Sequence, residues 1–311
     1  MSLLPSVQQF LDVTNQKKLE DAAKGVKRTP LSWRETAELG TRKFLKDNYD
    51  GVEITDDFVM SGKYPISIRI YNPDPSRKLP VLVFFHGGGF VLGSVVEADP
   101  LCRRFAKLTD HLVVFVDYRL APEFPYPVCI EDSKLVIEHL FEVLDDRKIP
   151  YSTKELSISG DSAGGGICVI LATDRDFIIK NNITKQVIFY PATNFNFDSE
   201  SMRTFADGYF ISRADLEWFF NNLFQNDEDR ESLSPLAAPT YPEMPKTLIF
   251  AAENDTLRDG SYLYYDKISG VTKTELILVE GVIHAFLRFE DLHKEINMGV
   301  YAKMKDFLSA Q

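Results

Sequence analysis

The sequence predicts an α/β fold, with a mostly parallel central sheet and helices on both of its faces. Short apolar runs recur along the chain, and segments with helical periodicity separate them. Strands that are apolar throughout are typical of a parallel sheet with both faces covered. Strands and helices that alternate in this way predict a doubly wound sheet. A chain of 311 residues can bury a large core, and we predict a single domain over residues 1–311.

The individual elements follow from local patterns. The first residues, about 50 of them, have helical character, and two short strands follow at Val52–Val59 and Ile66–Ile70. Apolar strands are then expected at Val81–Phe85, Leu112–Val116, Leu156–Ile158, Gln186–Phe189, Thr247–Phe250 and Glu275–Val279. Helices are expected between them, at Glu97–Thr109, Cys129–Leu144, Ala163–Ile179, Asp259–Ile268 and Glu290–Leu308.

The interval between Tyr190 and Lys246, about 55 residues, is too long for a simple connection between strands. It is rich in aromatic residues, namely Phe195, Phe197, Phe205, Tyr209, Phe210, Trp218, Phe219, Phe220 and Phe224. Two interpretations are compatible: a helical insertion with its own small core, and a cap that also lines an apolar pocket. We predict a helical cap formed by about residues 1–48 and about residues 194–226.

Composition argues against several classes of partner. The net charge of −11 opposes nucleic-acid binding, which needs a basic surface, and gives no electrostatic attraction to an anionic membrane. No window approaches the roughly 18 apolar residues of a membrane span, so stable membrane insertion is not expected. The segment Met1–Asn15 lacks the basic start and apolar run of a secretory signal, which predicts a cytoplasmic protein.

The sequence also gives no sign of a metal or cofactor site. Its cysteines, Cys102, Cys129 and Cys168, are widely spaced and indicate reduced thiols, not a disulfide framework or a zinc site. Leu92 and Ala163 stand where a dinucleotide-binding fingerprint would need glycine. We therefore expect no metal and no organic cofactor.

A nucleophile motif lies between an expected strand and an expected helix. The segment Gly160-Asp161-Ser162-Ala163-Gly164 has the pattern G-x-S-x-G. A sharp turn at this point exposes the serine oxygen above the sheet, and the helix start favours developing negative charge. Ser162 is therefore the candidate nucleophile.

A second glycine motif, His86-Gly87-Gly88-Gly89-Phe90, follows the strand Val81–Phe85. Backbone N–H groups in a glycine loop can reach the oxyanion of a tetrahedral intermediate without steric conflict. We expect Gly88 and Gly89 to supply one side of an oxyanion hole and the N–H of Ala163 to supply the other.

Charged residues near these motifs are expected to support the site. Arg119, Glu123 and Asp132 are expected to have a structural role there, for example by bracing the loop of His86. For Asp161 two roles are open: a contact with the same loop, or stabilisation of the helix start.

His284 is the candidate general base. It follows the strand Glu275–Val279 across a short loop, which places it at the edge of the sheet where Ser162 is expected. The other histidines fit less well: His86, His111 and His139 precede Ser162, and His293 falls within the last expected helix as a solvated group.

The acid of a triad should lie between Ser162 and His284 in the chain. Asp255 directly follows an expected strand, so it belongs to the same edge of the sheet. Glu253 and Asp259 lie close to it in the sequence, and the residues alone leave the choice among the three open.

The HGGGF and GDSAGG motifs together resemble the hormone-sensitive-lipase-like family of α/β-hydrolases, in the branch of GDSAG-type bacterial carboxylesterases. Further segments resemble that family in order, namely Tyr118–Glu123, Pro125–Pro127, Glu131-Asp132, Ser234–Leu236, Ala252–Gly260 and Gly281–Phe286. Two positions depart from the family pattern. Ala285 stands where the family usually has glycine, and Gly260 stands where it often has glutamate.

The resemblance implies an α/β-hydrolase fold, with the acid at Asp255 and a small-molecule ester as substrate. It implies a serine carboxylesterase that acts through an acyl-enzyme intermediate, and the compact cap favours short- to medium-chain esters. Deacetylase, amidase and lactone hydrolase remain alternatives, because the same triad serves all of them. A non-catalytic small-molecule receptor on this fold is less favoured, because such family members have lost the catalytic histidine, whereas His284 is present here. The resemblance also allows a homodimer formed through the last strand and helix.

Overall fold

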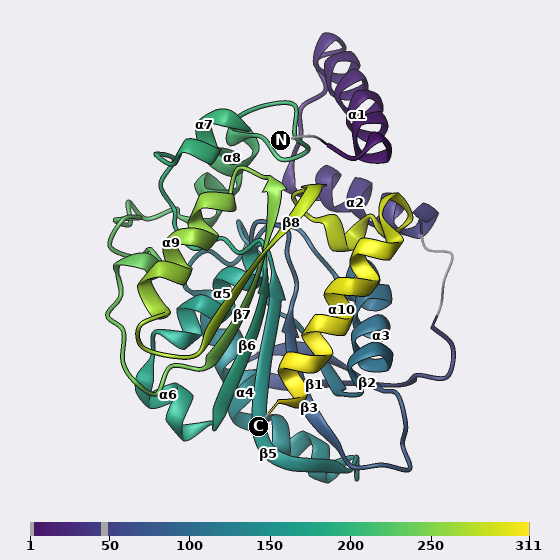
Figure 1. Cartoon of the computed structure of the whole chain (residues 1–311), viewed down its shortest axis with the longest axis vertical. Coiled ribbons are helices and arrows are strands. Elements are labelled where there is room, and N and C mark those ends of the chain that lie inside the picture. Colours follow the sequence, from purple (N-terminus) through teal and green to yellow (C-terminus); the bar gives the residue numbers. More distant parts are fainter. Residues whose placement is uncertain (1–2, 45–48, 311) are drawn as a thin grey trace.

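Eight strands form a single sheet in the order β1-β2-β4-β3-β5-β6-β7-β8 (Figure 1). The computed structural model describes residues 3–44 and 49–310. The strands are β1 (Glu53–Ser61), β2 (Tyr64–Asn72), β3 (Leu79–Phe85), β4 (Leu112–Asp117), β5 (Tyr151–Asp161), β6 (Ile183–Phe189), β7 (Lys246–Asn254) and β8 (Thr274–Ile283). β2 pairs antiparallel with β1 and with β4, and from β4 to β8 all neighbours pair parallel.

Helices cover the two faces of this sheet (Figure 1). They are α1 (Pro5–Ala23), α2 (Pro30–Phe44), α3 (Val95–Thr109), α4 (Val128–Asp146), α5 (Ala163–Ala172), α6 (Arg175–Lys180), α7 (Glu200–Thr204), α8 (Arg213–Leu223), α9 (Arg258–Ile268) and α10 (Lys294–Ser309). Alternate side chains of β3 enter different cores. Val83 and Phe85 belong to the core that includes α4 and α5, whereas Leu82 and Phe84 belong to the core that includes α3 and α10. The predicted mostly parallel sheet, buried on both faces, is confirmed.

The carboxyl ends of the parallel strands bring distant parts of the chain together. β3 leads into the loop of His86, and β5 leads into the turn of Ser162. β7 ends at Asn254, one residue before Asp255, and β8 ends at Ile283, directly before His284. Because parallel strands end at one edge of a sheet, these loops meet there.

The N-terminal helices contact the insertion that follows β6. The side-chain amide of Asn15 in α1 donates to the carbonyl of Gly208 at 3.0 Å. Trp33 in α2 packs on Trp218 and Phe219 in α8, with ring centroids 4.9 Å apart in both pairs. Figure 1 shows α1, α2, α7 and α8 grouped at the end of the molecule where the parallel strands terminate.

Two expected helices differ from the structure. The helix predicted at Ala163–Ile179 is interrupted after Ala172, because Asp174 accepts a hydrogen bond from the N–H of Phe177 at 3.1 Å and so caps a new helix, α6. The last helix was expected from Glu290 onward, but α10 starts at Lys294, after a short 3-10 turn.

His293 was expected to be solvated, and this was wrong. It lies in the turn before α10 with only 6% of its surface exposed. Its ring approaches the edge of Phe286 at a centroid distance of 6.2 Å. Burial lowers the pKa of His293 to about 4, so the ring is neutral near neutral pH.

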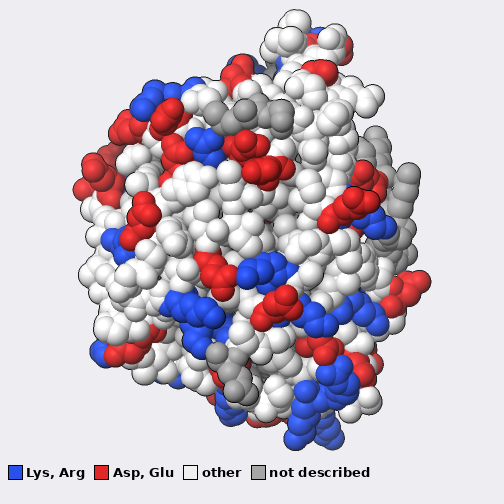
Figure 2. All heavy atoms as spheres, viewed as in Figure 1, with Lys and Arg blue, Asp and Glu red and all other residues white. Residues whose placement is uncertain are grey.

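The surface carries both signs of charge. On the face drawn in Figure 2, acidic and basic side chains are interspersed. Within the described ranges, no helix combines the length and the apolar character that crossing a bilayer requires.

All three cysteines, Cys102, Cys129 and Cys168, are free and buried.

Candidate active site

Ser162 occupies a strained turn between β5 and α5. Its backbone has φ 54° and ψ −116°, outside the regions that non-glycine residues ordinarily adopt. Glycines on both sides make this turn compatible with close packing. A Cβ on Gly160 would lie 2.3 Å from the backbone of Gly164, and a Cβ on Gly164 would lie 2.0 Å from the carbonyl oxygen of Phe85. The turn therefore packs directly against the end of β3, as a nucleophile elbow does.

His284 connects Ser162 to Asp255. Its Nε2 lies 2.9 Å from Ser162 Oγ, and its Nδ1 lies 2.7 Å from Asp255 Oδ2. A carboxylate can only accept, so Nδ1 carries the proton and Nε2 is left to accept the serine hydroxyl proton. The other carboxylate oxygen, Asp255 Oδ1, accepts the N–H of Leu257 at 2.9 Å, which fixes the orientation of the acid.

The two rival acids have other partners. Glu253, within β7, accepts the N–H of Gly281 in the neighbouring strand β8 at 2.8 Å. Asp259 accepts the N–H of Ser201 at 2.7 Å, at the start of α7. Of these three acids, Asp255 is the one that accepts a hydrogen bond from His284.

The loop after β3 presents free backbone donors beside Ser162. Gly88 and Gly89 have positive φ values, 125° and 62°. Within the described part of the chain, their N–H groups have no protein acceptor. Ala163 is the first residue of α5, so its N–H has no acceptor within the helix. A Cβ on Gly89 would lie 2.3 Å from the ring of Phe219, so this close approach requires glycine.

His86 and Asp161 fix the backbone of this loop through contacts with Gly87. His86 Nδ1 lies 2.8 Å from the carbonyl oxygen of Gly87, and the hydroxyl of Tyr118 donates to the carbonyl of His86 at 2.7 Å. Burial lowers the pKa of His86 to about 4, so the ring is neutral near neutral pH. Asp161 Oδ1 accepts the N–H of Gly87 at 2.6 Å, which answers the question that the sequence left open.

The charged residues expected to brace this loop divide into two groups. Asp132 accepts from the backbone N–H and the Nε of Arg119, at 3.0 Å and 2.9 Å. These contacts stabilise the segment after β4, so the expected contact of Arg119 and Asp132 with the His86 loop was wrong. Glu123 instead acts through Arg34, which pairs with it at 2.7 Å and donates to the carbonyl of Val91 at 2.7 Å.

A cavity of about 430 Å³ opens above Ser162. From the loops at the sheet edge it is lined by Gly88, Gly89, Leu92, Ser162, His284 and Ala285, and from the N-terminal segment and the insertion it is lined by Thr14, Lys17, Lys18, Val26, Trp33, Phe210 and Phe219. Both the N-terminal helices and the aromatic insertion therefore line the space above the serine. Apolar walls around a few polar groups are typical of small-molecule sites.

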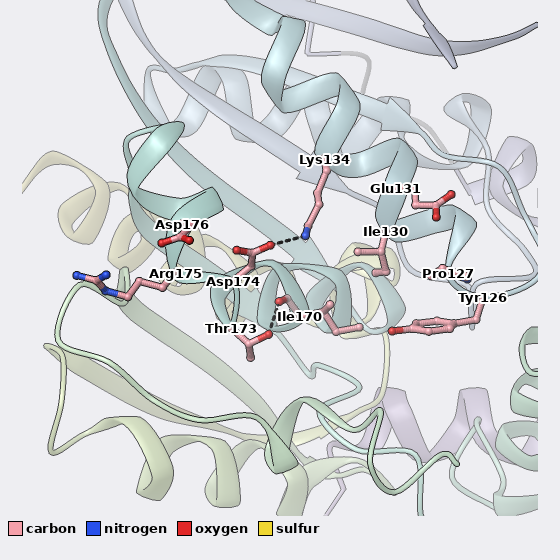
Figure 3. A pocket seen from close by; sticks show the side chains of 10 residues that line it. All are labelled: Tyr126, Pro127, Ile130, Glu131, Lys134, Ile170, Thr173, Asp174, Arg175 and Asp176. Carbon is pink, nitrogen blue, oxygen red and sulfur yellow. Dashed lines mark hydrogen bonds and ion pairs between the residues drawn. The ribbon is translucent and has the colours of Figure 1, made fainter. Parts of the chain in front are cut away.

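A second hollow lies between α4 and the α5–α6 turn, away from Ser162 (Figure 3). Its one lysine, Lys134, points toward Asp174 and forms a 2.5 Å ion pair with it. The nearby Thr173 hydroxyl donates to the carbonyl of Ile170 at 2.7 Å. Because these groups are already paired, this hollow offers no nucleophile comparable to Ser162.

The two departures from the family pattern have visible consequences. Ala285 adopts a left-handed conformation, with φ 62° and ψ 25°, that glycine would reach without strain. Gly260 lies close to Thr193, and a Cβ there would be 2.5 Å from Thr193 Oγ1. Glycine at position 260 therefore fits the present packing.

Three residues at the site were missed in the sequence. Arg34 reaches the loop after β3, while Glu97 and Arg288 line the cavity itself. No motif or periodicity indicated them; the one local signal was the position of Arg288, shortly after His284.

Comparison with known proteins identifies the family and the fold. A model of the α/β-hydrolase fold matches residues 82–288. The carboxylic ester hydrolase LipN of Mycobacterium tuberculosis is 31% identical over 249 residues, which cover 78% of this chain and 66% of that protein. An arylesterase of Saccharolobus solfataricus is 28% identical, over 98% of this chain and 99% of that protein. The solved structure of an esterase from Pyrobaculum calidifontis has a TM-score of 0.87 and 29% identity, covering 99% of this chain and 100% of that one. The predicted fold and resemblance are thus confirmed, and the chain belongs to the hormone-sensitive-lipase-like family of α/β-hydrolases.

Proposed function

We propose that this chain is a serine carboxylesterase, with Ser162 as nucleophile, His284 as general base and Asp255 as the acid of the triad. The observation that carries the proposal is the hydrogen-bonded series from Ser162 Oγ through His284 to Asp255, at 2.9 Å and 2.7 Å. At the Ser162 end of this series lie the backbone N–H groups of Gly88, Gly89 and Ala163. We propose that these three groups form the oxyanion hole. Relatives that are named as ester hydrolases support an ester bond as the bond that is cleaved.

The first half of the reaction acylates the enzyme. His284 Nε2 takes the proton of Ser162 as Oγ bonds to the ester carbonyl carbon, and the carbonyl electron pair moves onto its oxygen. The proposed N–H donors bind this oxyanion. When the intermediate collapses, the bond to the alcohol oxygen breaks, and protonated His284 gives its proton to the leaving alcohol.

The second half releases the acid. His284 takes a proton from water, the hydroxide attacks the acyl carbon, and the Ser162 ester bond breaks as Oγ regains a proton. Asp255 stabilises the imidazolium in both halves and keeps Nδ1 protonated. These steps use side chains and backbone groups of this chain.

The cavity supports short- to medium-chain esters as substrates. About residues 1–48 and about residues 194–226 are proposed as a cap within the single domain of residues 1–311, of which residues 1–2, 45–48 and 311 lie outside the described ranges. Trp33 comes from the first segment and Phe219 from the second. Their rings stack with centroids 4.9 Å apart, and both side chains line the cavity. This contact limits the length of an acyl or alcohol chain that fits beside Ser162. Amides, acetyl groups and lactones remain alternative substrates of the same triad.

Other properties of the protein are also proposed. We infer a cytoplasmic location and a small-molecule ester as the partner. A homodimer is supported by β8, which is the edge strand of the sheet, and by the groove that Ile277, Val279, Ile296 and Val300 line between β8 and α10. Unpaired edge strands are common sites of pairing. Light scattering of the purified protein measures this: a homodimer should have twice the mass of one chain, and the mass of a single chain would contradict the dimer.

Initial rates on two p-nitrophenyl esters test the proposed function. The butyrate should turn over faster than the hexadecanoate, and Ser162→Ala should lower kcat on the butyrate by roughly 10⁴–10⁶-fold. Faster turnover of the hexadecanoate would contradict the proposed chain length. Activity of Ser162→Ala close to that of the wild type would contradict the proposed nucleophile.

A further inference from the structure

Arg288 touches three separate parts of the candidate site. It ends the short 3-10 turn Phe286–Arg288, shortly after His284. Its Nη1 donates to Glu97 Oε2 in α3 at 3.1 Å, and its Nη2 donates to the carbonyl of Gly87 at 3.3 Å. Its Nε lies 3.6 Å from Asp161 Oδ2, next to the nucleophile. The histidine loop, the serine turn and the glycine loop therefore meet at one guanidinium.

The contact with the Gly87 carbonyl bears on the oxyanion hole. The carbonyl of Gly87 and the N–H of Gly88 belong to one planar trans peptide, so they point in opposite directions. Groups that hold the carbonyl therefore also set the direction of the Gly88 N–H. Two donors hold it here, His86 Nδ1 at 2.8 Å and Arg288 Nη2 at 3.3 Å.

This peptide needs external support because glycine stands on both sides of it. Glycine allows backbone rotations that other residues resist, and Gly88 already has a φ of 125°. Rotation of the Gly87–Gly88 peptide by half a turn would direct a carbonyl oxygen, not an N–H, at the substrate oxyanion. Asp161 holds the N–H of Gly87 at 2.6 Å, which fixes the preceding peptide, His86–Gly87, and leaves the Gly87–Gly88 peptide to the two donors on its carbonyl.

The surroundings of Arg288 keep it in place. The side chains of Glu97 and Asp161 are 3% and 2% exposed, while that of Arg288 is 27% exposed and borders the cavity. Burial disfavours the charged guanidinium, but the carboxylates of Asp161 and Glu97 outweigh it and raise the pKa of Arg288. Asp161 Oδ2 is buried and forms no hydrogen bond among the described residues, and the ion pair with Arg288 Nε at 3.6 Å places a positive charge beside it.

We propose that Arg288 is a positioning residue for ester hydrolysis, which holds the Gly87–Gly88 peptide so that the Gly88 N–H faces the substrate oxyanion. This inference rests on the proposed function. Arg288 acts through Gly87 and does not touch the reacting atoms. It should therefore affect binding of the transition state much more than binding of the ester.

The test compares Arg288→Met, Arg288→Lys and a matched control, Arg103→Met. Arg103 also pairs with a carboxylate, Asp99 at 2.7 Å, and its side chain is 24% exposed, close to the value for Arg288. The readouts are kcat and KM on p-nitrophenyl butyrate, with active sites counted by a fluorophosphonate, and the inhibition constant of a trifluoromethyl ketone. The ketone forms a tetrahedral adduct whose oxyanion occupies the proposed hole.

Arg288→Met should lower kcat per active site by roughly 10- to 100-fold, with little change in KM. This decrease should not exceed the decrease in kcat that removal of one oxyanion donor typically causes. The trifluoromethyl ketone should bind weaker by a similar factor. Arg288→Lys should recover part of both losses, because lysine keeps a charged donor but not the planar fork. Arg103→Met should match the wild type.

Two results would overturn the inference. One is an Arg288→Met variant with the kcat and ketone affinity of the Arg103→Met control. The other is a loss confined to KM or to the fraction of active sites, which would indicate a structural role alone. If Arg288→Met fails to fold, Arg288→Lys decides: full activity and ketone affinity overturn the inference, and a matched partial loss of both supports it. A wild type without esterase activity or fluorophosphonate labelling would instead reject the proposed function.

Discussion

Asp161 accepts a hydrogen bond from the backbone N–H of Gly87 at 2.6 Å, and so joins the turn of the candidate nucleophile to the loop of the candidate oxyanion hole. The fit is close, because a Cβ on Gly87 would lie 2.6 Å from Asp161 Oδ2. The residue beside Ser162 in sequence thus fixes a loop that arrives from β3. The two halves of the site are therefore coupled by one carboxylate.

Asp161→Ala should lower kcat on p-nitrophenyl butyrate by roughly 10²-fold, because the glycine loop loses its acceptor and the oxyanion donors lose their alignment. Asp161→Asn should lose much less, since an amide oxygen still accepts the Gly87 N–H. Steady-state kinetics on both variants, with thermal unfolding to verify the fold, measure this. Wild-type kcat in Asp161→Ala would show that the loop keeps its alignment without the carboxylate.

Asp255→Asn should lower kcat by about 10⁴-fold while the protein stays folded, because the amide no longer fixes the tautomer of His284. Glu253→Gln and Asp259→Asn are controls at the neighbouring acids. Both replacements keep an acceptor for the backbone N–H groups of Gly281 and Ser201, so kcat should stay near the wild-type value. If Glu253→Gln or Asp259→Asn showed the large loss and Asp255→Asn did not, the acid would be misassigned.

Ala285→Gly should raise the free energy of unfolding by about 1 kcal/mol, because Ala285 has a φ of 62° and glycine removes the steric cost of that conformation. Ala302→Gly is the control, at an exposed position within α10, where the same change should destabilise by roughly 0.5–1 kcal/mol. Denaturant unfolding of both variants measures the two changes in the free energy of unfolding, which should have opposite signs. Destabilisation of equal size at both positions would mean that Ala285 carries no strain.

Acid should destabilise the protein between about pH 6.5 and pH 4. Burial lowers the pKa of His86, His111 and His293 to about 4 from an ordinary value of 6.5. In that range the unfolded chain binds protons that the folded chain does not, so stability is complete above pH 6.5 and falls as the pH approaches 4. His293→Asn removes one such group, and its Tm should fall less between pH 7 and pH 4.5 than that of the wild type.

His139→Asn is the matched control for this pH dependence. His139 is an exposed histidine in α4, and its side chain is 45% exposed. Its Tm should follow the wild type across the same range. Parallel curves for His293→Asn and the wild type would contradict the assigned contribution of His293.

Much of the candidate site could be predicted because its parts lie in local motifs. Ser162, Gly88 and Gly89 belong to short segments whose glycines allow turns that other residues resist, and the strand before each segment fixes its place in the sheet. The triad acid was harder. Glu253 and Asp255 both follow the expected strand Thr247–Phe250, and only the structure shows that β7 extends past Glu253 and that Glu253 accepts from Gly281 of β8.

Other features depend on contacts between distant segments, which no local pattern encodes. Arg288 meets Glu97 from α3, and Arg34 meets Glu123, although long stretches of chain separate each pair. The burial of His293 likewise comes from the turn before α10 and not from the periodicity of the helix.

Covalent labelling by a fluorophosphonate tests the central claim, that Ser162 is the nucleophile, most directly. The wild type should gain the mass of one phosphonyl group, and peptide mapping should place it on the peptide that contains Ser162. Ser162→Ala should gain none under the same conditions. A labelled Ser162→Ala variant, or a wild type labelled at a different residue, would contradict the account.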